Sequence, residues 1–392
     1  MKSCLEISAD RLAGNYRALV EVAGADMPVM AVIKANAYGH GLAQCAPVLI
    51  QAGAQWLGIA DATEGAAVRA MVGEAPRILV MSGLQPEDAE AIVRHRLTPV
   101  VWTRDQIEWL AEAARQQRAG APFNVHLEID TGMARQGVAP GEELHSLLTW
   151  LTEQKALHVE GVMTHFASAE VADSALTLAQ RERFEQALSA IAAAGLRPSW
   201  VHAANSSTID NSSSHGRDCG SLIWLRQAAA AIGAQAMART GIALYGYCLP
   251  VEGAESLAQP KLRPVMTWKS RIIAIRNVNA GDTVGYNAAF TAPHAMRLAL
   301  LPVGYSDGLR RELSSTNSIP GGWVIVRGKR ANIIGRVSMN LTVVDVTEIS
   351  DAEVNDEVVL LGNGITADDH ARLAHTISYE ILCGIQGESR LV

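Results

Sequence analysis

Short apolar runs alternate with longer amphipathic segments over the first two-thirds of the chain. Each run holds five to seven residues, mostly aliphatic, the pattern of a strand buried on both faces of a parallel sheet. Segments between the runs, such as 103–118 and 177–194, place apolar residues at helical spacing, and Thr103 is a suitable N-cap. The eight predicted strands lie at 28–34, 56–60, 77–81, 98–102, 123–129, 159–164, 199–203 and 238–244.

Eight strand–helix repeats over about 245 residues match the size of a closed (β/α)8 barrel. A doubly wound open sheet is the alternative, because the order of elements along the chain is the same in both architectures. The number of repeats favours closure, which also leaves no strand at an exposed edge. We therefore predict an α/β fold with an N-terminal (β/α)8 barrel of the TIM type over residues 1–246.

The pattern changes after Tyr245, where strand-like runs follow one another without long helical segments between them. Gly, Asn and Pro turns separate these runs, as expected for antiparallel strands. The sequence therefore predicts a mainly antiparallel C-terminal β-domain over 247–392, with a helix over 366–385. The segment 206–226, rich in Ser and Gly, fits neither pattern, and we predict a surface loop inserted before the eighth strand.

Composition and charge narrow the class of protein. The 392 residues are 49% hydrophobic and 19% charged, which supplies a large core and is unlike a disordered chain. The net charge of −7 without any Lys/Arg cluster argues against a nucleic-acid partner. No apolar run approaches the ~20 residues that cross a bilayer, and charges from Glu6 onward interrupt any signal-peptide core. We therefore expect a cytoplasmic protein with no membrane partner.

The five cysteines do not form a metal-binding or disulfide pattern. They are odd in number and scattered, with no C-x-x-C pair and no histidine beside them at ligand spacing. We therefore expect no metal, and we interpret each cysteine as a small buried residue or an unpaired thiol. They are Cys4, Cys45, Cys219, Cys248 and Cys383.

A single lysine, Lys34, closes the first predicted strand. Side chains at the carboxyl ends of barrel strands face the active site, and a partly desolvated amine there has a lowered pKa that suits Schiff-base chemistry. A lysine that packs its stem on the barrel rim and keeps its amine in water would give the same pattern. Position alone therefore leaves both interpretations open.

The sequence around Lys34 favours the catalytic interpretation, because further motifs follow in order at the ends of later predicted strands. The motifs are V-I-K-A-N-A-Y-G-H-G (32–41), D-T-G-M-A-R (130–135), T-H-F-A (164–167), H-A-A-N-S (202–206), R-T-G-I-A-L-Y-G (239–246), V-G-Y-S-D-G (303–308), G-R-V-S-M-N (335–340) and Y-E-I-L (379–382). This ordered set resembles the alanine racemase family over nearly the whole chain. The resemblance implies that Lys34 binds pyridoxal 5′-phosphate (PLP) covalently.

The resemblance also implies an isomerase that interconverts L-alanine and D-alanine, with Lys34 and Tyr305 as its two catalytic bases. Racemisation removes a proton from one face of the substrate Cα and returns one to the opposite face, so groups are needed on both sides. In the family pattern Lys34 acts on the D enantiomer and Tyr305 on the L. An unperturbed phenol has a pKa near ~10, so Tyr305 needs a lowered pKa or a partner that accepts its proton.

By the same resemblance Arg239 faces the pyridine nitrogen of PLP. Arginine effectively never releases its proton, so it donates a hydrogen bond without protonating the ring. The ring is then a weaker electron sink, which favours racemisation over transamination. His165 matches the histidine that contacts the ring. The implied phosphate ligands are Tyr38, Ser206, the backbone amides of Gly241 and Ile242, and Tyr379, whose hydroxyl and N–H groups suit a dianion.

The resemblance places the substrate carboxylate against Arg135, through charge-assisted hydrogen bonds, and against the backbone of Met339. Many family members carry a lysine seven residues before this arginine, often carbamylated so that its carboxylate orients the guanidinium. This chain has Glu128 there. Glutamate already supplies a carboxylate, so we hypothesise that Glu128 pairs directly with Arg135 and that no carbamate is needed.

Asn340 departs from the family pattern, because ordinary alanine racemases usually have Asp after the methionine. Asn resembles members that act on serine or on a broader set of amino acids, so a serine or broad-spectrum racemase is an alternative. A non-catalytic PLP carrier is an alternative of another class, although such carriers lack the β-domain that bears Tyr305. Fold-related decarboxylases and aldolases would show a cysteine motif or metal ligands, and neither is found in the sequence.

The family's active site is shared across a homodimer, in which the equivalents of Tyr305 and Met339 reach the partner's barrel. The resemblance therefore implies a homodimer with shared active sites. The pathway that uses the product is left open by the sequence, with D-alanine supply for peptidoglycan precursors as one candidate.

Overall fold

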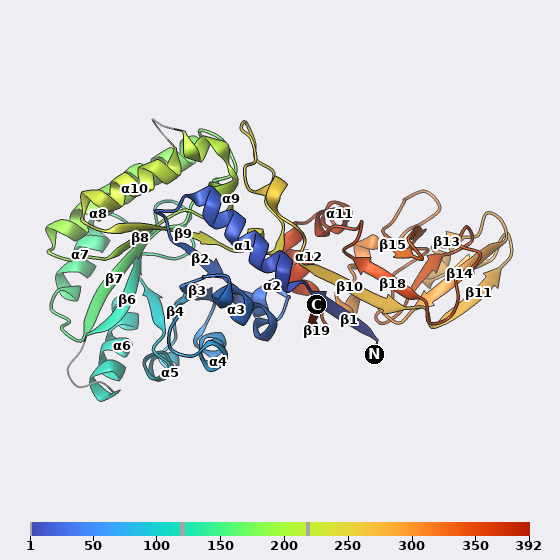
Figure 1. Cartoon of the computed structure of the whole chain (residues 1–392), viewed down its shortest axis with the longest axis horizontal. Helices are drawn as coiled ribbons and strands as arrows, with labels where there is room; N and C mark the ends of the chain where they lie inside the picture. The colour runs from blue at the N-terminus through green and yellow to red at the C-terminus, as the bar shows by residue number, and fades with distance from the viewer. Residues whose placement is uncertain (1, 118–121, 217–219) are drawn as a thin grey trace. The chain divides into compact units, whose positions relative to one another are not determined.

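The computed structural model describes residues 2–117, 122–216 and 220–392, and it divides the chain into two compact units (Figure 1). The barrel unit holds Asp10–Ala35 and Cys45–Arg263, and the β-unit holds Met1–Ala9, Asn36–Gln44 and Pro264–Val392. The sequence suggested a boundary between residues 246 and 247. In the structure the barrel unit continues to Arg263, and the β-unit takes in the first strand and the segment that follows Lys34.

Eight parallel strands close the barrel, which confirms the predicted fold class. All eight overlap the predicted runs because buried parallel strands are nearly continuous in apolar residues. In chain order they are β2 (Val29–Val32), β3 (Trp56–Ile59), β4 (Arg77–Val80), β5 (Thr98–Val101), β6 (Phe123–Glu128), β7 (Leu157–Met163), β8 (Trp200–His202) and β9 (Gln235–Thr240).

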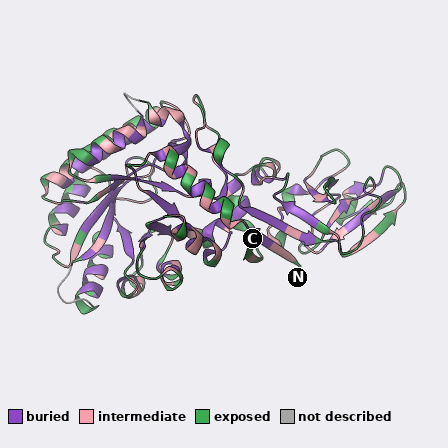
Figure 2. Ribbon diagram, viewed as in Figure 1, coloured by how far each residue is buried: buried purple, intermediate pink, exposed green. Residues whose placement is uncertain are grey.

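Helices surround this barrel, with their exposed residues on the outside and the buried ones facing the strands (Figures 1 and 2). Side chains cap several of them, as when the Asp61 carboxylate accepts the Glu64 backbone N–H at the start of α4. The α-helices of this region are α1 (Ala9–Ala23), α2 (Lys34–Tyr38), α3 (Leu42–Gln51), α4 (Ala62–Val72), α5 (Asp88–Arg94), α6 (Arg104–Gln117), α7 (Glu142–Leu151), α8 (Ala175–Ala193), α9 (Ser206–Asp210) and α10 (Ser221–Ala231). Among the described residues, no helix has the length and apolar character that a membrane span requires.

The barrel interior is a packed core that also holds several buried polar side chains. Six buried apolar residues form one cluster: Met30, Trp56, Leu79, Val100, Met163 and Met237. His126, His202 and Arg239 are buried inside the same barrel, although their polar atoms require hydrogen-bond partners there. The interior is therefore not the purely aliphatic filling that a barrel of this kind usually has.

The β-unit is built mainly from antiparallel strands, as predicted. Its six-stranded sheet has the order β16-β15-β18-β10-β1-β19, and a three-stranded sheet has the order β11-β14-β17. The strands are β1 (Ser3–Ile7), β10 (Met266–Arg271), β11 (Ala274–Val278), β12 (Thr283–Val284), β13 (Phe290–Thr291), β14 (Met296–Leu301), β15 (Trp323–Val326), β16 (Lys329–Asn332), β17 (Thr342–Asp345), β18 (Glu357–Leu361) and β19 (Glu388–Leu391). The predicted C-terminal helix is divided into α11 (Ala367–Leu373) and α12 (Ser378–Gly384).

The prediction of a surface loop over 206–226 was wrong for the described part of that segment. Helix α9 is fully buried, a 3-10 turn covers Ser212–His215, and α10 begins at Ser221. The Asp210 carboxylate explains the burial, since it accepts hydrogen bonds from the Ser256 hydroxyl and from two backbone N–H groups of the 258–259 segment. Residues 217–219, including Cys219, lie outside the described residues.

Candidate active site

Lys34 is the first residue of α2 and lies two residues after the end of β2, in a segment with an unusual backbone. The four residues that follow it, 35–38, all have φ between 51° and 56°. Left-handed helical conformation costs non-glycine residues about 1–2 kcal/mol each. Strain of this kind is concentrated at functional sites, where the surrounding structure holds it in place. The segment after Lys34 is therefore fixed in a conformation that it would not adopt in isolation.

The environment of Lys34 favours the neutral amine. The side chain is half-buried, and this burial is the main cause that lowers its pKa. The positive charges of Arg135 and Arg239 lower the pKa further, whereas Glu128 opposes them. A lysine with a lowered pKa at a barrel strand end is the arrangement that Schiff-base chemistry requires.

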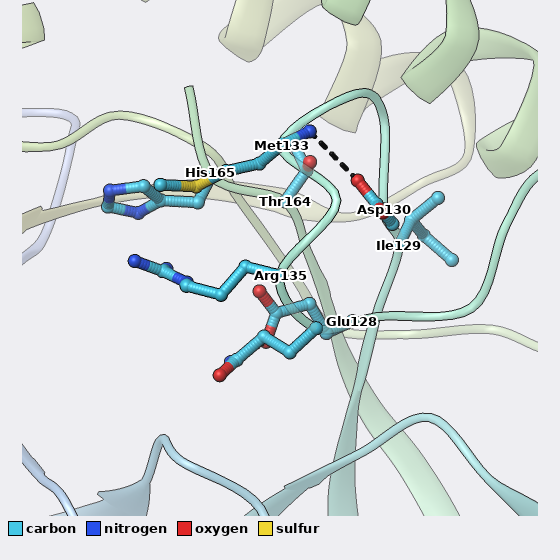
Figure 3. A pocket seen from close by; sticks show the side chains of 8 residues that line it. Glu128, Ile129, Asp130, Met133, Arg135, Thr164 and His165 are labelled. Atoms are coloured by element: carbon cyan, nitrogen blue, oxygen red, sulfur yellow. Dashed lines mark hydrogen bonds between the residues drawn. The ribbon is translucent and has the colours of Figure 1, made fainter. Parts of the chain in front are cut away.

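A small pocket lies at the ends of β6 and β7 and is lined by Glu128, Ile129, Asp130, Met133, Arg135, Gln136, Thr164 and His165 (Figure 3). Asp130 shapes its loop, because one carboxylate oxygen accepts the backbone N–H groups of Gly132, Met133 and Ala134. Figure 3 shows the Arg135 side chain extending from this loop into the pocket, on the same side as His165. The loop thus presents a guanidinium group at the carboxyl end of the barrel.

The predicted direct pairing of Glu128 with Arg135 was wrong. Among the described residues no hydrogen bond or ion pair joins them, and Glu128 instead accepts a hydrogen bond of 2.5 Å from Gln136 Nε2. The same amide group donates to the Met81 carbonyl at 2.9 Å. Burial raises the pKa of Glu128, while Gln136 and the charges of Arg239 and Arg135 lower it in part. Glu128 therefore acts on Arg135 through its charge and not through a contact.

Arg239, on β9, is held in place by five acceptors. Its Nη1 donates to the His202 carbonyl (2.9 Å) and to His202 Nδ1 (2.8 Å). Its Nη2 donates to the carbonyls of Thr164 and Ala203 and lies 3.3 Å from His165 Nδ1. Burial lowers the pKa of Arg239 to about 10, so the guanidinium stays charged at neutral pH. Burial and the Arg239 charge lower the pKa of His165 to about 3, so this imidazole is neutral.

The ends of β8 and β9 bring together hydroxyl and N–H groups. Ser206 begins α9, where the Asn205 side chain caps the helix, and its Oγ lies 3.3 Å from Thr240 Oγ1. The same hydroxyl oxygen accepts the Gly241 N–H at 3.0 Å. Ile242 begins the 3-10 turn that follows. The three predicted phosphate ligands of the barrel unit therefore lie in two adjacent segments.

In the β-unit, Tyr38 and Tyr379 lie close together, with ring centroids 6.1 Å apart. Tyr38 is buried, which raises its pKa. Gly39 permits this approach because its φ is +80° and an added Cβ would lie 2.2 Å from the Leu382 carbonyl oxygen of α12. Two predicted phosphate ligands that are far apart in the sequence are thus neighbours in the β-unit.

Tyr305, Met339 and Asn340 also lie together in the β-unit. The backbone N–H groups of Tyr305 and Ser306 donate to the carbonyls of Ser338 and Met339, both at 3.0 Å. The Ser306 hydroxyl donates to the Met339 carbonyl (2.8 Å) and accepts from Asn340 Nδ2 (2.7 Å). The Tyr305 and Met339 side chains remain exposed. The catalytic tyrosine predicted from the sequence is therefore fixed by its backbone and presented on the surface of its unit.

Sequence reasoning did not include several residues that the structure places beside the predicted site residues in the barrel unit and in the β-unit. Gln136 and Ser306 directly follow predicted site residues, so the only available signal was their position in the motifs. His126, Glu160 and His202 lie on buried strands, where charged or titratable residues are rare. Their presence in otherwise apolar runs was a signal that could have been used.

The barrel residues fit PLP by the chemistry of their donors and acceptors. Lys34 offers a nucleophilic amine, Arg239 offers a buried hydrogen-bond donor, and Ser206 with its neighbouring backbone amides suits a phosphate group. Among the residues that the structure describes, no group of three His, Cys, Asp or Glu side chains could hold a metal ion. A closed (β/α)8 barrel with this lysine, joined to a β-unit that carries an exposed tyrosine, defines the class of barrel enzymes that use PLP.

Comparisons with known proteins agree with this class. The family model of the alanine racemase N-terminal domain matches residues 7–249, and that of the C-terminal domain matches residues 265–392. The alanine racemase of Syntrophobacter fumaroxidans is 38% identical over 388 residues, which cover 98% of this chain and 95% of the relative. The alanine racemase of Symbiobacterium thermophilum is 38% identical over 385 residues, covering 97% of this chain and 94% of that protein.

Solved structures are similar over the whole length. The alanine racemase of Streptomyces coelicolor A3(2) has a TM-score of 0.86 at 34% identity, covering 100% of this chain and 97% of that one. The alanine racemase of Bartonella henselae, solved with covalently bound pyridoxal phosphate, has a TM-score of 0.82 at 25% identity and full coverage of both chains. The chain belongs to the alanine racemase family, as its motifs predicted.

Proposed function

We propose that this protein is a PLP-dependent alanine racemase that interconverts L-alanine and D-alanine. The observation that carries the proposal is the position of Lys34 at the end of the first barrel strand, with a lowered pKa, in a chain that matches both domains of the family. Bound PLP supplies an electron sink that stabilises the negative charge left when the substrate Cα loses its proton. The residues of the chain do the remaining work.

Lys34 would hold the cofactor through its amine, and the free amine would take or return a proton on one face of the substrate Cα. Its lowered pKa supports both roles, because only the neutral amine is a nucleophile and a base. Arg239 would donate a hydrogen bond to the cofactor ring while keeping its own proton. His165 would contact the ring as a neutral imidazole and would add no positive charge there.

The family pattern assigns the phosphate of the cofactor to two sets of groups, one within the barrel unit and one within the β-unit. Ser206 and the backbone amides of Gly241 and Ile242 supply donors at the ends of β8 and β9. The hydroxyls of Tyr38 and Tyr379, which pair in the β-unit, supply the others. Neutral hydroxyl and amide donors bind a dianion without introducing acidic protons that could reach the reacting carbon.

Arg135 would bind the substrate carboxylate through charge-assisted hydrogen bonds, and the family pattern adds the backbone of Met339 from a second copy of the chain. Its guanidinium extends into the pocket at the ends of β6 and β7 (Figure 3). Glu128 balances the positive charge of this region from a buried position behind the arginine. A permanent carboxylate at residue 128 makes a carbamylated lysine unnecessary for the purpose.

Tyr305 is the base for the opposite face of Cα, and we propose that a second copy of the chain receives it. Tyr305, Met339 and Leu341 are 43%, 56% and 40% exposed, which is unusual for large apolar side chains held on a rigid turn. A homodimer with shared active sites would cover them. The cytoplasmic location expected from the sequence stays a prediction, as does the use of the product in peptidoglycan synthesis.

Exchange of the α-proton in D2O across a panel of L-amino acids tests the activity and its specificity together. The holoenzyme is expected to exchange and racemise alanine, and Lys34→Ala is expected to lose the absorbance of covalently bound cofactor together with exchange. Arg197→Ala, which changes an exposed arginine bonded to nearby carbonyls, is a matched control that should keep both. Cofactor binding without exchange on any amino acid would instead identify a non-catalytic PLP carrier.

Faster exchange of serine than of alanine would favour the serine or broad-spectrum alternative. The feature that keeps this alternative open is Asn340, whose amide is bonded to Ser306 beside the tyrosine.

A further inference from the structure

A chain of polar side chains, buried except for Arg77 at its end, crosses the barrel interior from Arg239 toward the opposite end of the strands. Arg239 Nη1 lies 2.8 Å from His202 Nδ1, and His202 Nε2 lies 2.8 Å from His126 Nδ1. His126 Nε2 has no hydrogen-bond partner but lies 3.8 Å from Glu160 Oε2. Glu160 in turn forms an ion pair with Arg77, the first residue of β4. Five side chains from five strands thus form one line.

The direction of every proton in this line follows from Arg239. A guanidinium has donors only, so His202 Nδ1 must accept, and the proton of His202 must lie on Nε2. That N–H donates to His126 Nδ1, so the proton of His126 must also lie on Nε2, where it faces Glu160. All the N–H bonds therefore point the same way, from the cation of Arg239 toward the anion of Glu160.

Both histidines carry no charge of their own. Burial lowers the pKa of His126 and lowers that of His202 well below its usual value, and neither side chain is exposed to solvent. Glu160 remains ionised, because His126 and Arg77 outweigh the effect of its burial on its pKa. The line thus has a positive end at the candidate active site and a negative end near the start of β4.

The surrounding core is shaped to hold this line. The His126 ring packs directly against Gly161, where an added Cβ would lie 2.6 Å from ring atoms. Trp56 contacts the line twice, since its ring centroid is 5.4 Å from that of His126 and 4.7 Å from the Arg77 guanidinium carbon. Buried polar groups cost folding free energy relative to aliphatic side chains. A line of them kept through a barrel core therefore calls for a functional explanation.

We propose that Glu160 is a positioning residue of the active site, which acts through His126 and His202 to fix the orientation and the proton of Arg239. The inference rests on the proposed contact between Arg239 and the cofactor ring. The negative charge of Glu160 polarises the two aligned histidines, so that His202 Nδ1 becomes a stronger acceptor for Arg239. Arg239 is then a weaker donor toward the cofactor, and the ring withdraws fewer electrons from the reacting carbon.

The consequence is a restraint on the side reaction of transamination. In that reaction the amino group of alanine passes to the cofactor aldehyde, so that alanine is oxidised to pyruvate and the cofactor is reduced to its amine form. Removing the charge of residue 160 is expected to strengthen donation from Arg239 and to move electron density into the ring. The rate of transamination relative to racemisation should therefore rise, although residue 160 is not proposed to contact substrate or cofactor.

The test compares Glu160→Gln with Arg77→Met in the holoenzyme at about pH 8, where an isolated carboxylate is ionised. Both variants break the same ion pair, but only Glu160→Gln removes the charge that faces His126. We expect Glu160→Gln to raise the number of pyruvate molecules per racemisation event roughly three- to tenfold, the effect of about one hydrogen bond. The absorption maximum of the bound cofactor should shift, and KM for alanine should stay the same.

Both variants should lower the thermal stability, because both remove the ion pair of Arg77 with Glu160. Arg77→Met should change the pyruvate ratio by less than about twofold, because it removes only a partly exposed ion pair. Equal ratios in the two variants would overturn the proposal and leave Glu160 a structural role. Arg239→Gln separates this failure from failure of the proposed function. Gln is a neutral and therefore weaker donor than Arg, so Arg239→Gln should lower the pyruvate ratio. If Arg239→Gln lowers the ratio and Glu160→Gln leaves it unchanged, only the line is refuted; if neither variant changes the ratio, the contact of Arg239 with the cofactor is refuted as well.

A second measurement needs no variant at residue 160. In cofactor-free protein labelled with 15N-histidine, the imidazole nitrogen shifts report which nitrogen carries the proton. We expect His126 and His202 to be neutral and both protonated at Nε2. The signals of the two rings are assigned by their loss in His126→Gln and His202→Gln. A proton on Nδ1 of either ring, or a charged ring, would break the line and overturn the proposal.

Discussion

The hydrogen bond between Gln136 and Glu128 gives a stability prediction that depends on pH. Replacing Gln136 by Met keeps the side-chain length but removes the amide nitrogen. That nitrogen donates one hydrogen bond to the Glu128 carboxylate (2.5 Å) and one to the Met81 carbonyl (2.9 Å). Glu128 is only 2% exposed, so water cannot replace the lost donor. A hydrogen bond to a charged group contributes about 1.5–3 kcal/mol, and we expect the variant to lose an amount in this range at about pH 8.

The pH dependence follows from the direction of the pKa shift. Burial raises the pKa of Glu128 above its unfolded value, and Gln136 holds the rise in check. A carboxyl with a raised pKa takes up a proton on folding, so its contribution to stability falls as pH rises through the folded pKa. Gln136→Met raises that pKa further. The cost of the substitution should therefore be smallest below the unfolded pKa and grow as pH rises toward neutrality.

Urea unfolding of the two proteins at about pH 5 and about pH 8 measures this difference. Gln180→Met is a matched control, because Gln180 is fully buried near the same pocket but bonds only neutral groups: Thr131, the His165 carbonyl and the Ala167 N–H. Its cost should be the same at both values of pH. A Gln136→Met cost that is independent of pH, like that of the control, would refute the assignment of a charged Glu128.

Three further predictions concern the site. Tyr305→Phe should lower the racemisation of L-alanine by about 10²–10⁴-fold in stopped assays, with the absorbance of bound cofactor unchanged; an unimpaired rate would remove Tyr305 as a base. Asn340→Asp should lower the ratio of kcat/KM for serine to that for alanine, because Asp lacks the amide N–H that Asn340 donates to Ser306. An unchanged ratio would show that residue 340 does not set specificity. Glu128→Lys should lose activity in decarbonated buffer and recover it with bicarbonate, while the parent protein is indifferent; dependence of the parent on bicarbonate would contradict the proposed role of Glu128.

The fold could be predicted because its elements are encoded locally. The barrel strands are continuous apolar runs, and the helices between them carry their own caps, as Ser174 does for α8. The segment 206–226 was mispredicted because Ser and Gly are typical of loops, whereas its burial depends on contacts between Asp210 and a segment 46 to 49 residues later. Burial of that kind is not visible in local composition.

The candidate site could be predicted in its members but not in its contacts. Glu128 ends β6, and the motif that carries Arg135 begins two residues later, so spacing alone allowed the two to pair. Which side chain reaches the carboxylate depends on rotamers and on the Met81 carbonyl, which comes from another strand end. The line from Arg239 to Glu160 depends in the same way on the register between β6, β7 and β8. The individual roles of the site residues stay predictions until the variants are measured.

The place of β1 in the six-stranded sheet has a consequence for biosynthesis. β1 leaves the ribosome before the barrel strands, yet its neighbours are β10, which begins at residue 266, and β19, which ends at residue 391. Both edges of β1 therefore stay without partners while the barrel is being made, and closing so long a loop is entropically slow. Glu6 is the one charged residue of β1 and is bonded to Lys269 and Arg390 in the finished sheet; a charge on an unpaired strand disfavours its pairing with other nascent chains.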